Sequence, residues 1–115
     1  MKRGDIYLVN FSKKYNSEFG KIRPAVVIQN DIANRNIDKV DFKGITVAPL
    51  TTRLYSSSVR LRVQARDALM QTSDICINEI CTLDMSRFDL TKCLTKLTEK
   101  ELLVMQQQLR THLSL

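Results

Sequence analysis

The sequence has little of what metal sites, disulfide frameworks and membrane anchors are built from. Its 115 residues contain one histidine, three cysteines and no tryptophan. Cys76, Cys81 and Cys93 are odd in number and lack paired Cys-x-x-Cys spacing, which argues against a disulfide framework or a zinc site. No apolar run reaches the length that crosses a bilayer, and the first residues lack the apolar region of a signal peptide. We therefore expect a cytoplasmic protein that does not bind a membrane, with one domain, residues 1–115.

The chemistry open to the chain is narrow as well. Its only histidine is His112, so one chain cannot run an acid–base mechanism that needs two histidines. We see no cluster of metal ligands, and a metal-dependent nuclease needs several carboxylates around its ion. We expect no metal and no cofactor. An enzyme of this composition that acts on phosphate esters must work by positioning and charge, which suffices for RNA because RNA carries its own nucleophile, the 2′-OH.

Positive charge is plentiful but unevenly placed. The formal net charge is +6. Residues 1–66 hold 13 Lys and Arg against 5 Asp and Glu, whereas residues 67–115 hold 5 against 7. Such an excess suits a polyanionic partner, either nucleic acid or an acidic peptide, although it is also compatible with ordinary solvated charge.

One stretch, residues 21–31, organises the rest of the chain. Its apolar run, residues 25–28, is short and rich in β-branched residues, which predicts a buried strand. Pro24 opens the strand, and the residue before a proline is held extended. Arg23 therefore lies on a constrained backbone beside the core, where its guanidinium is suited to holding an anion. The alternative is a surface arginine paired with a nearby carboxylate.

Several further segments have the patterns of strands. Residues 1–11 predict a strand with Ile6, Leu8 and Phe11 turned inward, and residues 44–51 predict another in which Pro49 marks an edge or a bend. Alternation over residues 59–63 places Arg60 and Arg62 in solvent, where they either extend a phosphate-binding face or only keep the sheet soluble. Weaker strand signals occupy residues 75–77, 80–83 and 91–97, and residues 31–43 form a polar connection with room for a helical turn.

One helix is predicted after these strands. Thr98 and Glu101 have the spacing of a capping box, and apolar residues then recur at helical spacing, namely Leu102, Met105, Leu109 and Leu113. That stripe indicates a core or subunit contact. Many short strands followed by one helix predict a mainly β fold, an antiparallel β barrel with a helix packed on it.

The segment of residues 12–22 is polar and basic and is predicted to be a loop. Lys13, Lys14 and Lys21 are interleaved with Tyr15 and Phe19, a pattern typical of loops that bind single-stranded nucleic acid through charge and stacking. The alternative is a mobile loop with Phe19 packed against the barrel.

The order of short motifs along the chain resembles the MazF/PemK family of toxin ribonucleases from bacterial type II toxin–antitoxin modules. The matching segments are residues 3–7, 17–20, 23–31, 47–52 and 82–84, together with Arg87. The resemblance implies an SH3-like barrel with a C-terminal helix, similar also to the CcdB gyrase poisons, and a homodimer. It further implies sequence-specific, metal-independent cleavage of single-stranded RNA that leaves a 2′,3′-cyclic phosphate and a 5′-OH, and a cognate acidic antitoxin of the MazE type.

The resemblance also assigns residues. The family's catalytic arginine falls on Arg23 and its catalytic threonine on Thr51. We assign RNA contacts to two groups, residues Ser17, Glu18, Phe19 and Lys21 in the loop and residues Thr52, Arg53 and Arg60 further along.

The chain departs from the family pattern in one region. Many relatives carry an arginine where this chain has Cys81, and other polar positions are occupied here by Cys76 and Asn78. Glu79 stands where glutamine is common. These departures put RNA contacts along residues 76–81 in question. Two other functions remain open, a gyrase-binding toxin of the CcdB type without nuclease activity and a barrel that binds RNA or peptide without chemistry.

Overall fold

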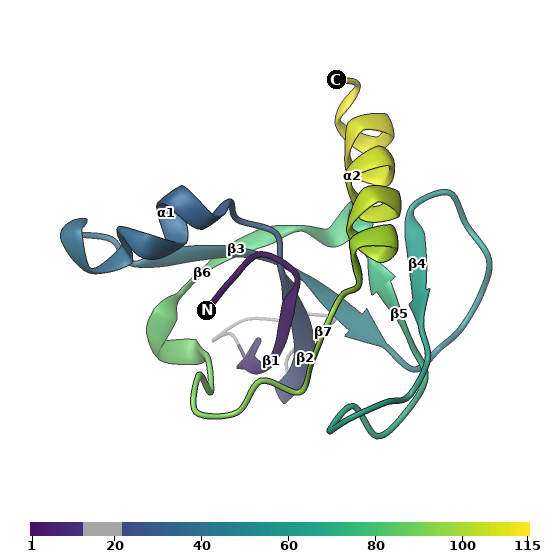
Figure 1. Cartoon of the computed structure of the whole chain (residues 1–115), viewed down its shortest axis with the longest axis horizontal. Helices are drawn as coiled ribbons and strands as arrows, with labels where there is room; N and C mark the ends of the chain where they lie inside the picture. The colour runs from purple at the N-terminus through teal and green to yellow at the C-terminus, as the bar shows by residue number, and fades with distance from the viewer. Residues whose placement is uncertain (13–21) are drawn as a thin grey trace.

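An antiparallel sheet forms the body of the protein, and a long helix lies against one part of it (Figure 1). The computed structural model describes residues 1–12 and 22–115. Within these residues the strands are β1 Asp5–Asn10, β2 Ile22–Val27, β3 Gly44–Thr51, β4 Arg60–Val63, β5 Ser73–Cys76, β6 Cys81–Asp84 and β7 Thr95–Lys96. They pair in the order β4-β5-β3-β2-β1-β7, and β6 pairs with β3. The predicted fold class, a mainly β barrel-like sheet with a C-terminal helix, is confirmed.

The helices occupy the connections and the end of the chain. Helix α1 Asp31–Arg35 and the 3-10 turn η1 Ile37–Lys39 lie in the polar connection between β2 and β3. Two further 3-10 turns, η2 Ile77–Glu79 and η3 Met85–Arg87, flank β6, and helix α2 Glu99–Leu113 follows β7. None of the described helices is long and apolar enough to span a membrane.

Helix α2 begins at the predicted capping box. The Thr98 hydroxyl accepts a hydrogen bond from the Glu101 N–H at 3.2 Å, and the Glu101 carboxylate accepts one from the Thr98 N–H at 2.8 Å. Met105 and Leu109 face the sheet, whereas Leu113 is 47% exposed. The predicted apolar stripe therefore reaches the core only as far as Leu109, because the last turn of α2 extends beyond the sheet (Figure 1).

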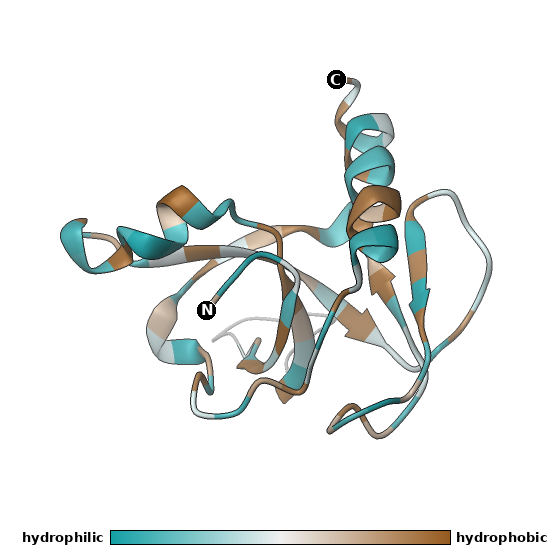
Figure 2. Cartoon of the chain, viewed as in Figure 1, coloured by the Kyte–Doolittle hydropathy of each residue, from teal (hydrophilic) through white to brown (hydrophobic). Residues whose placement is uncertain are grey.

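The two faces of the sheet carry separate apolar clusters. The larger cluster includes Val26, Leu50 and Ile75 and packs against Met105 of α2. The smaller cluster lies on the other face and is built from residues of β1, β2 and β3, namely Tyr7, Val9, Phe11, Ala25, Val27, Ile45 and Val47. Coloured by hydropathy, the strands carry many hydrophobic residues, and α2 has both hydrophobic and hydrophilic segments (Figure 2).

Strand β1 corrects one prediction about the core. Ile6 and Phe11 are buried as predicted, but Leu8 is 36% exposed. Tyr7 and Val9 are buried instead, in the smaller cluster on the opposite face. The larger cluster covers β1 only near Ile6. At Leu8 the same face of the strand is therefore exposed to solvent.

Pro49 lies within an interior strand, where one edge of that strand changes its partner. One edge of β3 pairs with β2, and its other edge pairs with β6 through residues 44–47 and with β5 through residues 50–51. Residues 48 and 49 fall between these two partners, where a missing N–H removes no ladder hydrogen bond. The change of partner turns the end of β3 towards β5, and Thr51 is its last residue.

Candidate active site

Strand register brings four polar side chains into one row. Thr51 is paired with Asp74 of β5, and Asp74 is paired with Arg62 of β4. The β2–β3 register pairs Ala25 with Pro49, and when it is continued by two residues Arg23 comes level with Thr51. Residues paired across antiparallel strands project to the same side. The polar row therefore lies on the face opposite α2.

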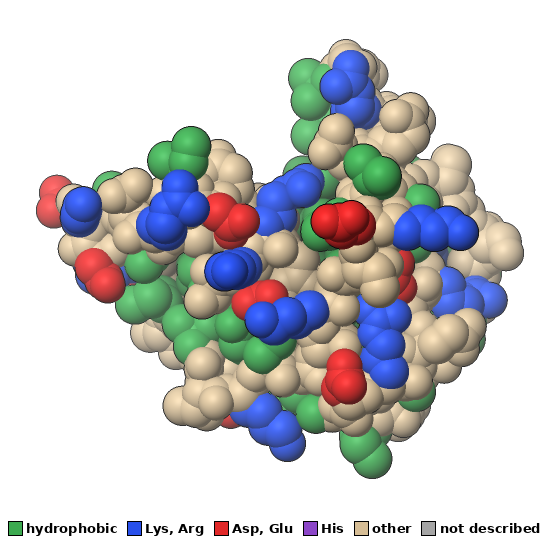
Figure 3. All heavy atoms as spheres, in the orientation of Figure 1, with side chains coloured by type: hydrophobic (Ala, Val, Ile, Leu, Met, Phe, Trp, Pro, Cys, Tyr) green, Lys and Arg blue, Asp and Glu red, His purple; other side chains and the backbone are tan. Residues whose placement is uncertain are grey.

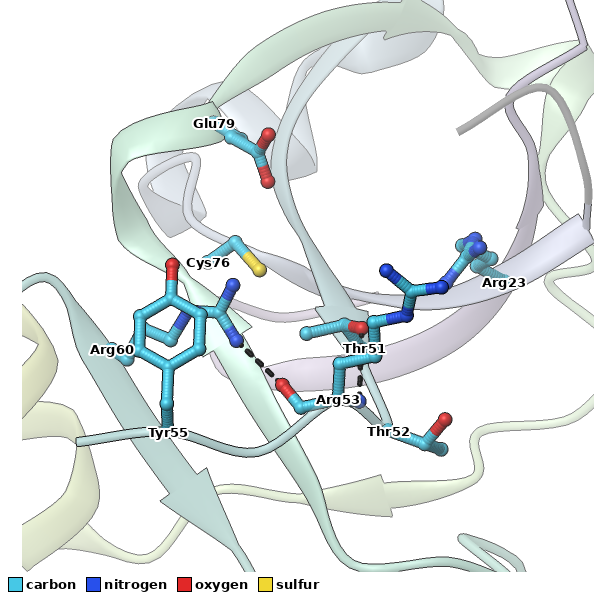
Figure 4. A pocket seen from close by; sticks show the side chains of 8 residues that line it. All are labelled: Arg23, Thr51, Thr52, Arg53, Tyr55, Arg60, Cys76 and Glu79. Carbon is cyan, nitrogen blue, oxygen red and sulfur yellow. Dashed lines mark hydrogen bonds between the residues drawn. The ribbon is translucent and has the colours of Figure 1, made fainter. Parts of the chain in front are cut away.

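A cavity of about 750 Å³ opens beside this row (Figure 4). Arg23 enters it from β2 and Arg60 from β4, with Thr51 between them. Its lining includes five residues that the sequence predicts for the site, Arg23, Thr51, Thr52, Arg53 and Arg60, and three that it does not, Tyr55, Cys76 and Glu79.

The remaining predicted site residues, Ser17, Glu18, Phe19 and Lys21, lie outside the residues that the structure describes, as does the rest of the predicted basic and aromatic loop.

Thr51 is held firmly at the cavity wall. Its side chain is buried, with 8% of the residue exposed, and its hydroxyl oxygen accepts a hydrogen bond from the Arg53 N–H at 3.2 Å. A hydroxyl has one proton to donate and two lone pairs, so Thr51 keeps its O–H for another acceptor. This arrangement suits a residue that orients an oxygen of a ligand.

Arg60 is placed differently from the prediction. Its side chain is only 12% exposed rather than solvated. One guanidinium nitrogen donates to the Arg53 carbonyl at 2.7 Å, and the guanidinium carbon lies 3.6 Å from the centre of the Tyr55 ring. The sequence pattern assigned Arg60 to the outer face correctly, but that face is hollowed here and bounded by the loop of residues 52–59.

Asp74 lies beneath this loop and was not predicted as a site residue. It is 1% exposed and accepts hydrogen bonds from the Tyr55 N–H at 3.0 Å and from Arg62 at 3.0 and 3.4 Å. Burial opposes ionisation of Asp74, but these hydrogen bonds and the charges of Arg62 and Arg60 hold the pKa of its carboxyl below its usual value. Asp74 is therefore ionised at neutral pH.

Cys76 lines the cavity as a neutral thiol. Burial raises the pKa of Cys76 to about 11, because it outweighs the opposing charge of Arg60, and the neighbouring Glu79 adds a smaller raising effect. The thiolate is the nucleophilic form of cysteine, so Cys76 is unreactive near neutral pH. Cys76 is only 1% exposed, so it is a small buried residue of the cavity wall.

The charge of the cavity favours anions. Three arginines, Arg23, Arg53 and Arg60, line it together with one carboxylate, Glu79. Lys and Arg side chains are also spread over the face seen in Figure 3, with fewer acidic side chains among them. Within residues 1–12 and 22–115, no group of three or more His, Cys, Asp or Glu side chains is arranged to hold a metal ion. The cavity offers guanidinium groups, hydroxyls and an aromatic ring as its ligand-binding groups.

Comparison with known proteins places the chain in a family. Residues 2–113 match the family described as the PemK-like, MazF-like toxin of type II toxin–antitoxin systems. The chain belongs to this family. It is 36% identical over 105 residues to the endoribonuclease MazF of Staphylococcus saprophyticus, a match that covers 89% of this chain and 82% of that protein.

Solved structures of MazF-type proteins share the fold. The toxin MazF-mt6 of Mycobacterium tuberculosis superimposes with a TM-score of 0.77 at 16% identity, covering 96% of this chain and 97% of that one. A mycobacterial endoribonuclease solved in complex with its cognate antitoxin gives a TM-score of 0.76 at 20% identity, covering 100% and 96%.

The departures from the MazF/PemK pattern divide into two groups in space. Cys76 and Glu79 line the cavity, whereas Asn78 and Cys81 are not among its lining residues. Asn78 is exposed on η2, and Cys81 packs partly buried against the smaller apolar cluster. Arg60 lies directly across from Cys76 in the β4–β5 register. At this part of the cavity wall the positive charge therefore comes from β4, since β5 has a neutral cysteine there.

Proposed function

We propose that this chain is the toxin of a type II toxin–antitoxin pair and acts as a sequence-specific endoribonuclease on single-stranded RNA. The observation that carries the proposal is the cavity in which Arg23 and Thr51, on adjacent strands, lie with two further arginines. Membership of the PemK/MazF family and the similarity to a MazF endoribonuclease support the same activity.

The proposed reaction uses the nucleophile of the substrate. The 2′-oxygen attacks the adjacent phosphorus as it loses its proton to solvent, and the bond from phosphorus to the 5′-oxygen breaks. The leaving oxygen takes up a proton, so the products are a 2′,3′-cyclic phosphate and a 5′-OH. Negative charge builds on the non-bridging oxygens, and a guanidinium positioned for that charge lowers the barrier. We assign this role to Arg23, with Thr51 donating a hydrogen bond that orients the phosphate.

The remaining cavity residues bind rather than react in this proposal. Thr52, Arg53 and Arg60 contact the RNA chain, and Ser17, Glu18, Phe19 and Lys21 contribute from the loop before β2. Cleavage of mRNA inhibits translation and growth, and it takes place in the cytoplasm. The residues present supply the reaction without a metal or cofactor.

Two protein partners belong to the proposal. One is a second copy of the chain, as in the homodimers of the family, and the other is a cognate acidic antitoxin of the MazE type. A cavity lined by arginines is a natural target for an acidic segment that occupies the place of RNA. Both RNA and antitoxin should therefore bind more weakly as salt concentration rises.

The test is incubation of the purified protein with a long transcript in the presence of EDTA, followed by sequencing of the new 5′-OH ends. The proposal predicts cuts at one short sequence and strongly reduced cutting by folded Arg23→Ala. Intact RNA, or unchanged cutting by that variant, would refute it. DNA cleavage complexes trapped on gyrase with RNA left intact would instead identify a CcdB-type toxin.

A further inference from the structure

Among the residues that the structure describes, Asp74 is a deeply buried ionised group beside the cavity. Its side chain is 1% exposed, and its partners are Arg62, the Tyr55 N–H and, at 3.6 Å, a guanidinium nitrogen of Arg60. Removing a carboxylate from water costs several kcal/mol, and an apolar pair of similar shape is often as stable as a buried ion pair. Stability alone therefore gives little reason for a carboxylate at this position.

The contacts of Arg60 show what the carboxylate holds in place. The Arg60 side chain lies between Asp74, the Arg53 carbonyl at 2.7 Å and the Tyr55 ring at 3.6 Å. The Arg60 backbone carbonyl is also fixed, because it accepts a hydrogen bond from Gln108 of α2 at 2.9 Å. A long, flexible side chain is thus restricted to one arrangement at the cavity wall.

Asp74 also fixes the loop that bounds the cavity. It accepts the N–H of Tyr55, and the ring of Tyr55 in turn lies over Arg60. Arg60 and Arg62 project from the same face of β4, so without a carboxylate between them their charges would repel each other. A single buried anion therefore sets the positions of a loop and of two cations.

We propose that Asp74 is a positioning residue of the ribonuclease site, which holds Arg60 so that its guanidinium contacts the RNA phosphate chain from the side opposite Arg23. This inference rests on the proposed function, because it assigns a part of the same site. Figure 4 shows the two guanidinium groups on opposite sides of the cavity with Thr51 between them. Arg60 binds the phosphate chain, and Asp74 acts through Arg60, which it holds both directly and by way of Tyr55.

The first experiment compares Arg60→Met with Arg35→Met, which makes the same change of charge and shape at an exposed position on α1. The assay is kcat/KM on an RNA oligonucleotide that contains the mapped cleavage sequence. Arg60→Met should lower kcat/KM by about 10- to 100-fold, the loss expected for a charge-assisted contact, and Arg35→Met by less than about twofold. Arg60→Lys should fall between wild type and Arg60→Met, since it keeps the charge and loses the planar fork.

The second experiment separates positioning from folding with a double-mutant cycle. Asp74→Asn should lower kcat/KM by about tenfold in the wild-type background and by less than about twofold in the Arg60→Met background. A general loss of structure would lower activity equally in both backgrounds. Melting temperatures of all variants identify any that do not fold.

The outcomes distinguish this inference from the proposed function. A wild-type protein that leaves RNA intact would refute both. Active wild type with inactive Arg23→Ala, but with Arg60→Met within about twofold of Arg35→Met, would overturn the inference and leave the proposed function standing. Equal losses from Asp74→Asn in both backgrounds would show that Asp74 does not act through Arg60. If Asp74→Asn fails to fold, Asp74→Glu, which keeps the charge and moves the carboxylate, takes its place in the same cycle with the same expected coupling to Arg60.

Discussion

Neighbouring residues of the same strands serve opposite faces of the sheet. Leu50 and Ile75 lie in the larger apolar cluster against α2, while Thr51 and Asp74, one residue away on each strand, lie in the polar row beside the cavity. The apolar face is completely buried at these positions, and the polar face holds charged groups in contact with each other. Along these two strands, residues that stabilise the fold therefore alternate with residues that line or support the cavity.

The comparison shows why the cavity residues are so well fixed. A rigid apolar layer on one side determines the backbone positions, and strand register then carries Arg23, Thr51 and Asp74 to one row on the other side. Preorganised groups of this kind stabilise charge without reorganisation during reaction. Substitutions on the α2 face should change stability, and substitutions in the polar row should change cleavage.

The largest expected effect is on the α2 face. Met105→Ala removes a fully buried side chain and should lower the free energy of unfolding by about 2–5 kcal/mol. Urea unfolding measures this loss. Cleavage by the folded variant at low temperature should stay near the wild-type rate. A large loss of cleavage there would show that the α2 face also contributes to catalysis.

The next effect is in the polar row. Thr51→Val keeps the shape and the β-branch but removes the hydroxyl, and it should slow cleavage by about 10- to 100-fold with little change in stability. Thr46→Val is the matched control, because Thr46 lies on the same strand and its hydroxyl bonds to that of Thr82 at 2.8 Å, away from the cavity. Equal cleavage rates for the two variants would show that the Thr51 hydroxyl has no role in cleavage.

A smaller effect concerns the helix that covers the apolar face. Thr98→Ala removes the hydroxyl that accepts a hydrogen bond from the Glu101 N–H. The free energy of unfolding should fall by about 1 kcal/mol. Thr111→Ala, an exposed change within the same helix, should cost less, since alanine favours the helix interior. Neither variant should change cleavage, and a loss of cleavage in either would link α2 to the cavity more closely than the structure indicates.

The smallest effect is a pH dependence at the start of α2. Hydrogen bonds from Arg66, together with those from Thr98 and the charge of Arg66, outweigh partial burial and lower the pKa of Glu101 below 4.5. Ionised Glu101 therefore stabilises the folded protein. This contribution is fully present above pH 4.5 and is lost as the pH falls through the lowered pKa of Glu101 in the folded state.

Glu101→Gln tests this, because it removes the charge and keeps the cap. The variant should be less stable than wild type by less than about 1 kcal/mol at neutral pH. Unfolding curves of the two proteins should converge in acid. A difference in stability between the two proteins that persists in acid would show that it does not arise from the charge of Glu101.

Much of this architecture follows from local sequence patterns. The alternation at residues 59–63, the run at residues 25–28 and the capping box at Thr98 each reflect short-range constraints, and the structure confirms the elements that they predict. The run at residues 25–28 also made Arg23 a candidate, because it placed that side chain beside the start of a buried strand. Thr51 became a candidate only through the resemblance to the MazF/PemK family.

What the sequence did not predict depends on contacts between distant segments. Leu8 is exposed because the larger cluster ends near Ile6, and Arg60 is mostly enclosed because the loop of residues 52–59 folds over it. Asp74 was missed although one signal was available. A lone carboxylate within an apolar strand, preceded by a strand with two arginines, indicates a cross-strand ion pair.

The central claim is that the polar face is a ribonuclease site in which Arg23 stabilises the scissile phosphate. Its most direct test is the single-turnover rate of Arg23→Ala on the mapped RNA oligonucleotide with EDTA present, beside a melting curve of the same protein. We predict a rate about 10²- to 10³-fold below wild type with a nearly unchanged melting temperature. Cleavage by the folded variant within about threefold of the wild-type rate would contradict the claim.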